Sequence, residues 1–555
     1  MANTLYYGDN LEILRQYIAD ESVDLIYLDP PFNSNQSYNV LFAEHDGTKA
    51  AAQVQAFEDT WEWDESAARA YEGIVEAGGP ASQALQAFRA LAGTSDMLAY
   101  LSMMAPRLVE LRRTLKPEGS IYLHCDPTAS HYLKLLMDGI FGPDNFQNEI
   151  IWKRTLAHGS AKRFGPVHDV ILFYSKCSVF AWYNPRVGYD EDYIRSHFKQ
   201  SDAEAGETYQ AISLTGAGIR GGDSGLPWRG FDPTVIGRHW ALPGRIMTEL
   251  GLVSGATQDR LDELDRAGRI YWPKKKGGWP RFKWFLSDSP GSAVQDVWTD
   301  IPPINSQAQE RLGFPTQKPE TLLSRIITAS TEEGQTVLDP FCGCGTAIAA
   351  AERLGRQWIG IDITHLAINL VRHRLRSSFG EDIAFRVIGE PKDLSGAAQL
   401  AASEPYQFQW WALGLVGARP AEQKKGADKG IDGRLFFHDE RTNGKTKQII
   451  FSVKAGKAGA SHVRDLVGVL DREKAAIGVL ISMQEPTREM RKEAATAGFY
   501  ASPWGTKHPR VQLLTVADLL AGGKVDYPPT RANVTLRKAP KARGSGSEQP
   551  ELFGN

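Results

Sequence analysis

The chain has 555 residues, of which 42% are hydrophobic, 23% charged and 10% aromatic, a balance typical of folded globular proteins. This length exceeds one ordinary core and predicts two to four domains, while the formal net charge of −3 gives no overall attraction to polyanions. No apolar run reaches the roughly 18 residues that cross a bilayer, and the first residues lack a secretory signal, so we expect a cytoplasmic protein with no membrane partner. The four cysteines are too scattered for a disulfide framework, so we expect free thiols.

Strands and helices alternate in the first third of the chain. Apolar runs at residues 4–7, 23–28 and 120–124 predict strands, and the patterns at 11–18 and 98–115 predict helices. This alternation predicts a mostly parallel sheet with helices on both faces.

A second alternation follows an irregular stretch rich in Gly, Pro and Trp. It comprises a predicted helix at residues 320–328 and predicted strands at 336–339 and 358–361. The expected fold class is therefore α/β, with a doubly wound sheet split by an inserted domain and a smaller α/β domain behind it.

The domain boundaries follow from these changes of pattern. We expect a doubly wound domain at 1–182 and 306–392 with a mostly helical insertion at 35–93, an inserted domain at 183–305, a linker at 393–405, a smaller α/β domain at 406–525, and a disordered tail at 526–555.

The motif Asp29-Pro30-Pro31-Phe32 directly follows a predicted strand and so lies at the carboxyl edge of the sheet, where open α/β folds bind ligands. The amino group of adenine or cytosine is a poor nucleophile because its lone pair is delocalised into the ring. The Asp29 carboxylate can accept one amino proton and the Pro30 carbonyl the other, which directs the lone pair towards an electrophilic methyl group. The prolines fix that carbonyl, and Phe32 offers a ring for an extruded base. Alone, the motif also fits an ordinary turn.

A second motif, residues 337–346, joins a strand to a glycine turn and an Ala-rich helix. Such a turn lets the backbone approach a ligand closely, although nicotinamide enzymes use similar turns. Asp362 ends the next strand, where an acid binds the ribose hydroxyls of a nucleoside cofactor; an ordinary ion-paired Asp is the alternative.

Over about residues 1–385 the chain resembles the β group of DNA amino-methyltransferases, in which the D-P-P-F box precedes the F-x-G-x-G box. Further matching segments are Gly8-Asp9-Asn10, Leu123-His124-Cys125-Asp126 and Thr316-Gln317-Lys318-Pro319. The resemblance implies that S-adenosylmethionine is the cofactor, that Asp9 contacts its adenine, and that Thr316 and Lys318 line its methionine end. It assigns the cofactor turn to Asp339, Phe341, Gly343, Gly345 and Thr346.

In this family an acidic first residue of the box usually accompanies adenine N6 methylation, and serine usually accompanies cytosine N4. Asp29 therefore favours adenine, with cytosine N4 as the alternative. We expect a site-specific methyltransferase of double-stranded DNA that flips its target base and belongs to a prokaryotic or phage modification or restriction-modification system. The resemblance also implies a homodimer, and the substrate implies a location at the nucleoid.

Basic residues interleaved with aromatic residues lie in and beside the inserted domain. They suit phosphate contact and base stacking, so we expect this domain to recognise the target, although core tryptophans and solvated lysines explain each residue equally well. The residues are Lys153, Arg154, Lys162, Arg163, Trp228, Arg229, Arg238, His239, Trp240, Lys274, Lys275, Lys276, Trp279, Arg281, Phe282, Lys283 and Trp284.

The carboxyl-terminal domain resembles, over roughly 110 residues, the catalytic domain of Mrr-type restriction nucleases. The resemblance implies a possible nuclease site in which Asp432 binds Mg²⁺ and Lys454 helps to activate water. Ser452 replaces the usual Glu or Gln, and Glu473 is a candidate substitute. An active nuclease, which would make the chain a single-chain restriction-modification enzyme, and an inactive DNA-binding module both stay open.

The tail contains Gln549-Pro550-Glu551-Leu552-Phe553, which resembles the short peptides by which bacterial proteins dock on the replication sliding clamp. An incidental match in a disordered end is the alternative.

Overall fold

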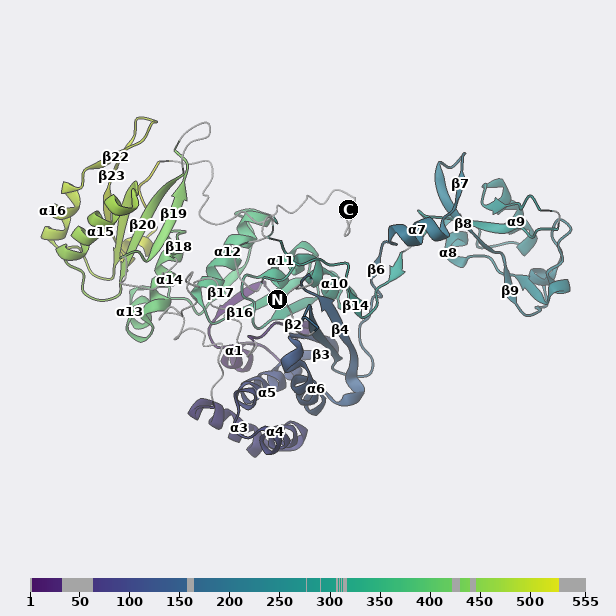
Figure 1. Ribbon diagram of the computed structural model, residues 1–555, viewed down its shortest axis with the longest axis horizontal. Coiled ribbons are helices and arrows are strands. Elements are labelled where there is room, and N and C mark those ends of the chain that lie inside the picture. Colours follow the sequence, from purple (N-terminus) through teal and green to yellow (C-terminus); the bar gives the residue numbers. More distant parts are fainter. Residues whose placement is uncertain are drawn as a thin grey trace. The chain divides into compact units, whose positions relative to one another are not determined.

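A computed structural model describes residues 2–31, 63–156, 164–275, 277–289, 291–305, 308, 310, 312, 317–421, 430–439 and 446–528 (Figure 1). The chain divides into two compact units, of which the first combines Met1–Tyr183 with Gln295–Gln549 and the second begins at Asn184 and runs to Val294. None of the helices in the described ranges has the length and apolar character needed to span a membrane. All four cysteines are free thiols.

The first unit contains a nine-stranded sheet in the order β14-β4-β5-β3-β2-β15-β16-β1-β17. All neighbours are parallel except β5, which runs antiparallel to β3 and β4. The strands are β1 (Thr4–Tyr7), β2 (Val23–Leu28), β3 (Leu115–Cys125), β4 (Phe146–Lys153), β5 (His168–Ser175), β14 (Val297–Trp298), β15 (Thr336–Asp339), β16 (Gln357–Asp362) and β17 (Arg386–Ile388). The expected α/β class with a mostly parallel sheet is confirmed.

The strands that precede the two motifs are neighbours in this sheet. β2 pairs with β15 through Leu25↔Val337 and Ile26↔Leu338, although more than 300 residues separate them in sequence. β16 pairs with β15 on its other side. Because parallel strands end at the same edge, both motifs open at one edge of the sheet.

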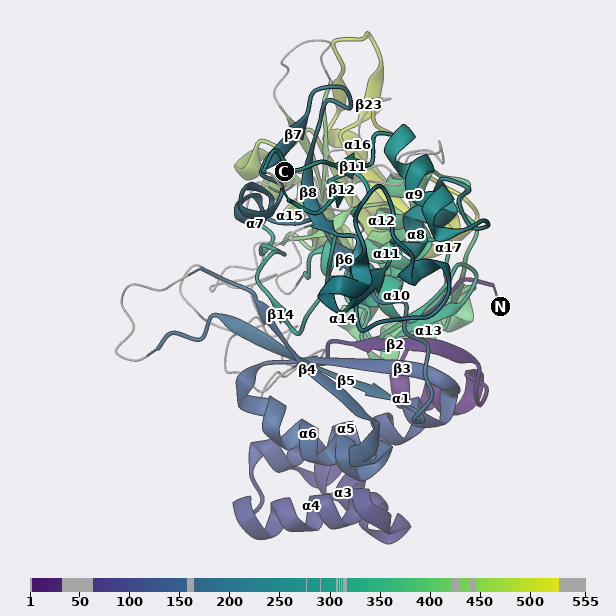
Figure 2. The same ribbon diagram turned by 90° about the vertical axis from the view of Figure 1, so that its right-hand side faces the viewer.

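Helices cover both faces of this sheet. They are α1 (Asn10–Tyr17), α3 (Glu65–Ala77), α4 (Gly79–Ala92), α5 (Asp96–Thr114), α6 (Pro127–Phe141), α10 (Glu320–Ser330), α11 (Thr346–Arg353) and α12 (His365–Phe379). Figures 1 and 2 show α5 and α6 next to the sheet and α3 and α4 beyond them. The described part of the expected insertion at 35–93 is thus helical, and its first 28 residues, 35–62, lie outside the described residues.

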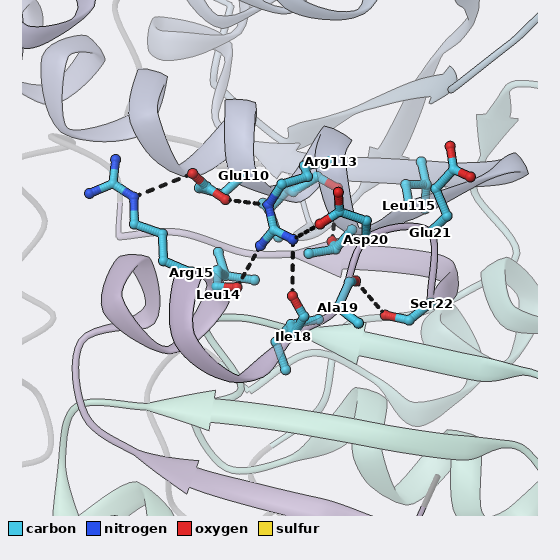
Figure 3. Close-up of polar contacts among 12 residues, drawn as sticks. Leu14, Arg15, Ile18, Ala19, Asp20, Glu21, Ser22, Glu110, Arg113 and Leu115 are labelled. Atoms are coloured by element: carbon cyan, nitrogen blue, oxygen red, sulfur yellow. Dashed lines mark hydrogen bonds and ion pairs between the residues drawn. The ribbon is translucent and has the colours of Figure 1, made fainter.

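An arginine on α5 fastens the end of α1 (Figure 3). Arg113 donates to the carbonyls of Leu14 at 2.6 Å and Ile18 at 3.1 Å, and it pairs with Glu110 at 2.6 Å and with Asp20. The last carbonyls of a helix have no partner within the helix, so Arg113 satisfies that of Leu14, together with the carbonyl of the C-cap residue Ile18, and fixes α1 against α5.

The second unit has its own core and its own sheet, in the order β11-β12-β8-β7, with all pairs antiparallel. The core gathers Trp228, Trp240, Leu261, Leu264 and Phe282, which are all buried. The elements are β6 (Arg186–Val187), α7 (Glu191–His197), β7 (Gln200–Asp202), β8 (Glu207–Ser213), β9 (Thr215–Ala217), β10 (Arg238–Trp240), α8 (Gly244–Glu249), α9 (Thr257–Arg266), β11 (Ile270–Tyr271), β12 (Arg281–Phe285) and β13 (Ser292–Ala293).

The end of this unit differs from the expected boundary at residue 305. Residues 295–305 belong to the first unit, because β14 pairs with β4 and Trp152 donates its ring N–H to the Ile301 carbonyl at 2.9 Å. Their composition resembles that of the insertion, but their hydrogen bonds extend the large sheet.

The carboxyl-terminal part of the first unit forms a five-stranded sheet in the order β18-β19-β20-β21-β24. Its elements are α13 (Leu394–Ser403), α14 (Pro405–Leu415), β18 (Arg419–Pro420), β19 (Gly433–Phe437), β20 (Lys447–Lys454), α15 (Ala460–Glu473), β21 (Ile477–Ser482), α16 (Arg488–Thr496), β22 (Phe499–Ala501), β23 (Lys507–Pro509), β24 (Val511–Thr515) and α17 (Val516–Leu520).

Two expectations at the borders of this part are wrong. The expected linker 393–405 is largely helix α13, with Ala397 fully buried. The expected tail begins later than residue 526, because Asp526 bonds His508 at 2.7 Å and Tyr527 packs against Phe437 with ring centroids 5.7 Å apart. Residues 529–555, with the clamp-like peptide, lie outside the described residues.

Candidate active site

Asp29 stands immediately after β2, and its two carboxylate oxygens differ in environment. Oδ2 accepts a hydrogen bond from Lys318 Nζ at 2.5 Å, and the side chains of Asp29 and Lys318 are 16% and 12% exposed. Oδ1 is buried and has no hydrogen-bond partner among the described residues. A buried acceptor without a donor costs about 1–3 kcal/mol, and among the described residues this oxygen therefore has unused capacity to accept a hydrogen bond. The next two residues, Pro30 and Pro31, are both buried.

Lys318 therefore contacts the D-P-P-F motif, a contact that the sequence did not predict. The position of Lys318 at the methionine end of the cofactor remains a prediction. The hydrogen bond to Asp29 is a second interaction of Lys318, beside the predicted one. Phe32 and Thr316, predicted for base stacking and cofactor binding, lie outside the described residues.

A buried polar chain lies behind Asp29. Tyr27 Oη lies 3.0 Å from His124 Nδ1, and His124 Nε2 lies 3.1 Å from Asp169 Oδ2. Burial would raise the pKa of Asp169, but the hydrogen bond with His124 and the charges of His124, Lys318 and Arg154 outweigh it and hold that pKa below its usual value. Asp169 therefore stays ionised, and the chain fixes β2, β3 and β5 beneath the site.

Sequence reasoning missed two members of this chain. His124 lies in a matched segment, but no motif marks Tyr27 or Asp169 as its partners. Arg154, which the sequence grouped with DNA-contacting residues, pairs with Asp169 at 3.2 Å.

The turn after β15, which is predicted to contact the cofactor, is hydrogen-bonded to the next strand. Cys342 donates to the Ile361 carbonyl at 3.0 Å, and Gly343 donates to Asp362 Oδ2 at 3.0 Å. Gly345 has φ +72°, and a Cβ there would lie 2.9 Å from a methyl group of Val371. Glycine is therefore required for both the backbone conformation and the close approach of α12.

Asp362 and Asp339 are the two acids of this turn. The Asp362 carboxylate accepts hydrogen bonds from Gly343 at 3.0 Å and from the backbone and hydroxyl of Thr364, both at 2.9 Å. Much of its acceptor capacity is therefore used within the protein. Burial raises the pKa of Asp362 to about 6. Burial also raises the pKa of Asp339 well above its ordinary value, and the charges of Asp29 and Asp362 add to that shift.

The Gly8-Asp9-Asn10 segment is attached to the same turn. Asn10 donates to the Pro340 carbonyl at 2.9 Å, and Gly8 donates to the Asp362 carbonyl at 3.0 Å. Arg107, from α5, donates to Asn10 at 2.6 Å and to Asp9 at 2.6 Å.

Asp9 also caps α1 by accepting from the backbone N–H of Leu11 at 2.9 Å. Both carboxylate oxygens of Asp9 thus have partners within the protein, Leu11 for Oδ1 and Arg107 for Oδ2. The contact of Asp9 with the cofactor adenine stays a prediction. Arg107 is a residue that sequence reasoning missed, because the sequence does not distinguish it from Arg112 and Arg113 of the same helix.

Thr346 and Phe341 complete the predicted turn. Thr346 begins α11, and its hydroxyl accepts from Arg374 at 3.0 Å. Arg374 is 1% exposed and also pairs with Glu320 at 3.2 Å. Phe341 donates its backbone N–H to Asp339 at 3.1 Å. The turn is thus held on both sides by buried polar contacts.

The candidate nuclease residues meet only in part. Asp432 Oδ2 accepts from the Val453 backbone at 2.6 Å, which brings Asp432 next to the Ser452 to Lys454 segment, and Ser452 is buried. Glu473 instead pairs with Arg434 at 2.9 Å, and its carbonyl accepts from Gln448 at 2.8 Å.

Gln448 lies four residues before Ser452 on β20, which is about 13 Å along a strand. The structure therefore does not bring Glu473 to Asp432 as a substitute ligand. Among the described residues, no group of three or more His, Cys, Asp or Glu side chains could hold a metal ion.

The family model described as DNA methylase, for N6 and N4 methyltransferases, matches residues 23–372. The chain belongs to this DNA methylase family. The type II methyltransferase M.EcaI of Enterobacter cloacae is 29% identical over 376 residues, which cover 67% of this chain and 69% of that protein. The Mod subunit of the type III restriction-modification enzyme StyLTI of Salmonella typhimurium is 28% identical over 368 residues, which cover 64% of this chain and half of that protein's length.

Among solved structures, PvuII DNA methyltransferase (cytosine-N4-specific) is 13% identical and covers 67% of this chain and 85% of its own, with a TM-score of 0.32. Residues 405–521 match a second family model, described as NACHT-associated inactive restriction endonuclease. This match agrees with the expected restriction-nuclease type of the carboxyl-terminal domain.

Proposed function

We propose that this methylase transfers a methyl group from S-adenosylmethionine to N6 of a flipped-out adenine in double-stranded DNA, as part of a modification or restriction-modification system. The observation that carries the proposal is the buried Oδ1 of Asp29, which has no partner among the residues that the structure describes and lies at the sheet edge where the glycine turn also opens.

The chain's own residues account for activation of the amine. Lys318 binds Oδ2 of Asp29 and so leaves Oδ1 to accept one N6 proton. The Pro30 carbonyl accepts the other, and the nitrogen lone pair is then directed out of the base plane. The proton that the product nitrogen must lose leaves through solvent or this hydrogen-bonded acceptor, and no strong base is required.

The residues around the turn suit the cofactor. S-adenosylmethionine supplies an electrophilic sulfonium methyl group when it is bound. Asp362 ends β16, where its carboxylate is placed to accept a hydrogen bond from a ribose hydroxyl. In the glycine turn, Gly343 is partly exposed and has no side chain, so a nucleoside could approach the backbone closely there, whereas Gly345 is buried against α12.

The choice of adenine over cytosine rests on Asp29 as the acidic first residue of the box. The test is incubation of the full chain with unmodified genomic DNA and S-adenosylmethionine, followed by digestion and mass spectrometry of the nucleosides. N6-methyldeoxyadenosine is expected, and an Asp29→Asn variant is the matched control. N4-methyldeoxycytidine as the product would overturn the adenine assignment, and no methylated nucleoside would overturn the proposed function.

A further inference from the structure

The second unit contains a cavity of about 480 Å³ on one face of its four-stranded sheet. Gln200, Ala211, Tyr271 and Arg281 line it from β7, β8, β11 and β12. Directly paired residues, and residues two apart on one strand, share a face of the sheet. The pairings Gln200↔Tyr209, Arg281↔Ser213 and Tyr271↔Arg281 therefore put all four lining residues on the face opposite Phe282, which is buried in the unit's core.

The rim of the cavity is the loop between β11 and β12. Pro273, Lys275, Gly277, Gly278 and Trp279 contribute to its lining. Gly277 has φ +77°, and a Cβ on Gly278 would lie 2.7 Å from the Pro273 ring. The loop therefore folds back tightly on itself, and Ala211 at the floor leaves the space open because its side chain is small.

The lining carries two cations and no carboxylate. No hydrogen bond or ion pair of the Lys275 ammonium group is found within the part of the chain that the structure describes, whereas the Lys275 carbonyl accepts from Gly278 at 2.9 Å. The guanidinium group of Arg281 makes there one long hydrogen bond of 3.4 Å, to the Ala211 carbonyl. The nearby carboxylate of Asp202 is neutralised by Lys283 at 2.6 Å. The charge of the cavity is thus positive and available to an anion.

The remaining lining groups suit a base. Tyr271 and Trp279 provide aromatic surfaces, on which any base can stack. Gln200 provides an amide whose Oε1 is buried without a hydrogen-bond partner among the described residues. A glutamine amide pairs in bidentate fashion with the N6 and N7 edge of adenine, and such a contact discriminates between bases.

We propose that this cavity binds one nucleotide of the DNA strand, with its base against Tyr271 and Trp279 and its phosphate on Lys275 and Arg281, and that Gln200 reads the base edge. It is a nucleotide-binding site distinct from the Asp29 site. The proposal rests on the proposed function, because it takes DNA as the substrate.

The test measures binding of the full chain to a labelled duplex that carries its methylation sequence, by fluorescence anisotropy over a range of salt concentrations. Loss of one phosphate contact lowers the slope of log affinity against log salt by about 1 and the affinity about tenfold near 0.1 M salt. Lys275→Gln and Arg281→Gln are expected to show this loss. Lys199→Gln is the matched control, because Lys199 is an exposed lysine of the same unit that does not line the cavity and is not among the basic residues expected to contact DNA. Equal slopes in all three variants and the wild type would overturn the proposal.

A second readout concerns the base. Gln200→Ala is expected to relax one position of the recognition sequence when DNA from expressing cells is sequenced for methylation, and an unchanged sequence would overturn the role of Gln200. Titration with dAMP distinguishes a free nucleotide from DNA as the ligand. If dAMP binds saturably, and Arg281→Gln removes this binding but leaves duplex binding unchanged, the cavity is a free-nucleotide site and the proposal is overturned.

These outcomes separate the cavity from the proposed function. A wild-type chain that binds the duplex without methylating it would contradict the proposed function, and the salt slopes would still decide the cavity. Full methylation with unchanged slopes would contradict the cavity alone.

Discussion

The Asp362 carboxylate gives cofactor binding a pH dependence whose size can be worked out. Burial raises its pKa to about 6, from an ordinary value of 3.8. The ionised carboxylate is the stronger acceptor for a ribose hydroxyl, because charge-assisted hydrogen bonds are roughly twice as strong as neutral ones. If the cofactor selects the ionised form, its affinity falls about twofold at pH 6 and about tenfold at pH 5, relative to neutral pH.

The same shift acts on folding with the opposite sign. The raised pKa means that the folded state holds this proton more tightly than the unfolded chain, so Asp362 lowers stability as pH rises from about 4 to about 6, by at most about 3 kcal/mol. Bound cofactor is expected to offset part of that loss above pH 6.

Calorimetric titration with S-adenosylmethionine between about pH 5 and about pH 7.5 measures this effect. The wild type is expected to lose affinity towards low pH, whereas Asp362→Asn binds weakly throughout and loses the pH dependence. The variant also separates Asp362 from Asp339, whose pKa is raised by burial as well. An affinity that is constant over the range, or the same slope in wild type and variant, would refute the reasoning.

Three further predictions concern the turn and the carboxyl-terminal region. Gly345→Ala is expected to lower the free energy of unfolding by about 2–4 kcal/mol, because it combines left-handed backbone strain with overlap against Val371 on α12. Gly334→Ala is the control, since Gly334 has φ +82° but open space around it, and it is expected to lose only about 1–2 kcal/mol. Equal losses in thermal unfolding would contradict the overlap. Any DNA cleavage by the full chain is expected to vanish with EDTA and in Asp432→Ala, and cleavage that survives both would remove this domain as its source. A labelled peptide of the carboxyl-terminal tail is expected to bind the sliding clamp in the micromolar range, about −8 kcal/mol, and to lose binding when Leu552 and Phe553 become Ala; equal anisotropy for both peptides would show the motif to be accidental.

The α/β fold and the placement of Asp29 beside the cofactor turn could be predicted from the sequence because both depend on local patterns. An apolar run followed by D-P-P-F or by a glycine turn marks a strand end. Parallel strands then bring the two ends to one edge.

The partners of the site residues could not be predicted in this way. Lys318 and Asp29 are 289 positions apart, and Arg107 and Asp9 are 98 positions apart. No local periodicity specifies which buried cation meets which carboxylate, because that pairing is set by how α5 and the segment before α10 pack on the sheet.

Composition misjudged two boundaries for a related reason. The segment 393–405 is rich in small residues, which also occur in linkers, yet α13 buries Ala397 against the next helix. Residues 295–305 share the irregular composition of the inserted domain, but backbone pairing with β4 assigns them to the large sheet. Tertiary contacts determine the structure of both segments, and amino-acid composition carries little information on such contacts.

The most direct test of the central claim compares the wild type with Asp29→Asn in single-turnover methylation, with cofactor affinity measured in parallel. The substitution keeps the shape of the side chain but replaces the carboxylate that we propose accepts a hydrogen bond from the target amine. We predict a rate about 10²–10³ times lower with nearly unchanged cofactor affinity, because the interaction is made mainly in the transition state. Near-normal turnover in Asp29→Asn would contradict the assignment of Asp29 to the target amine.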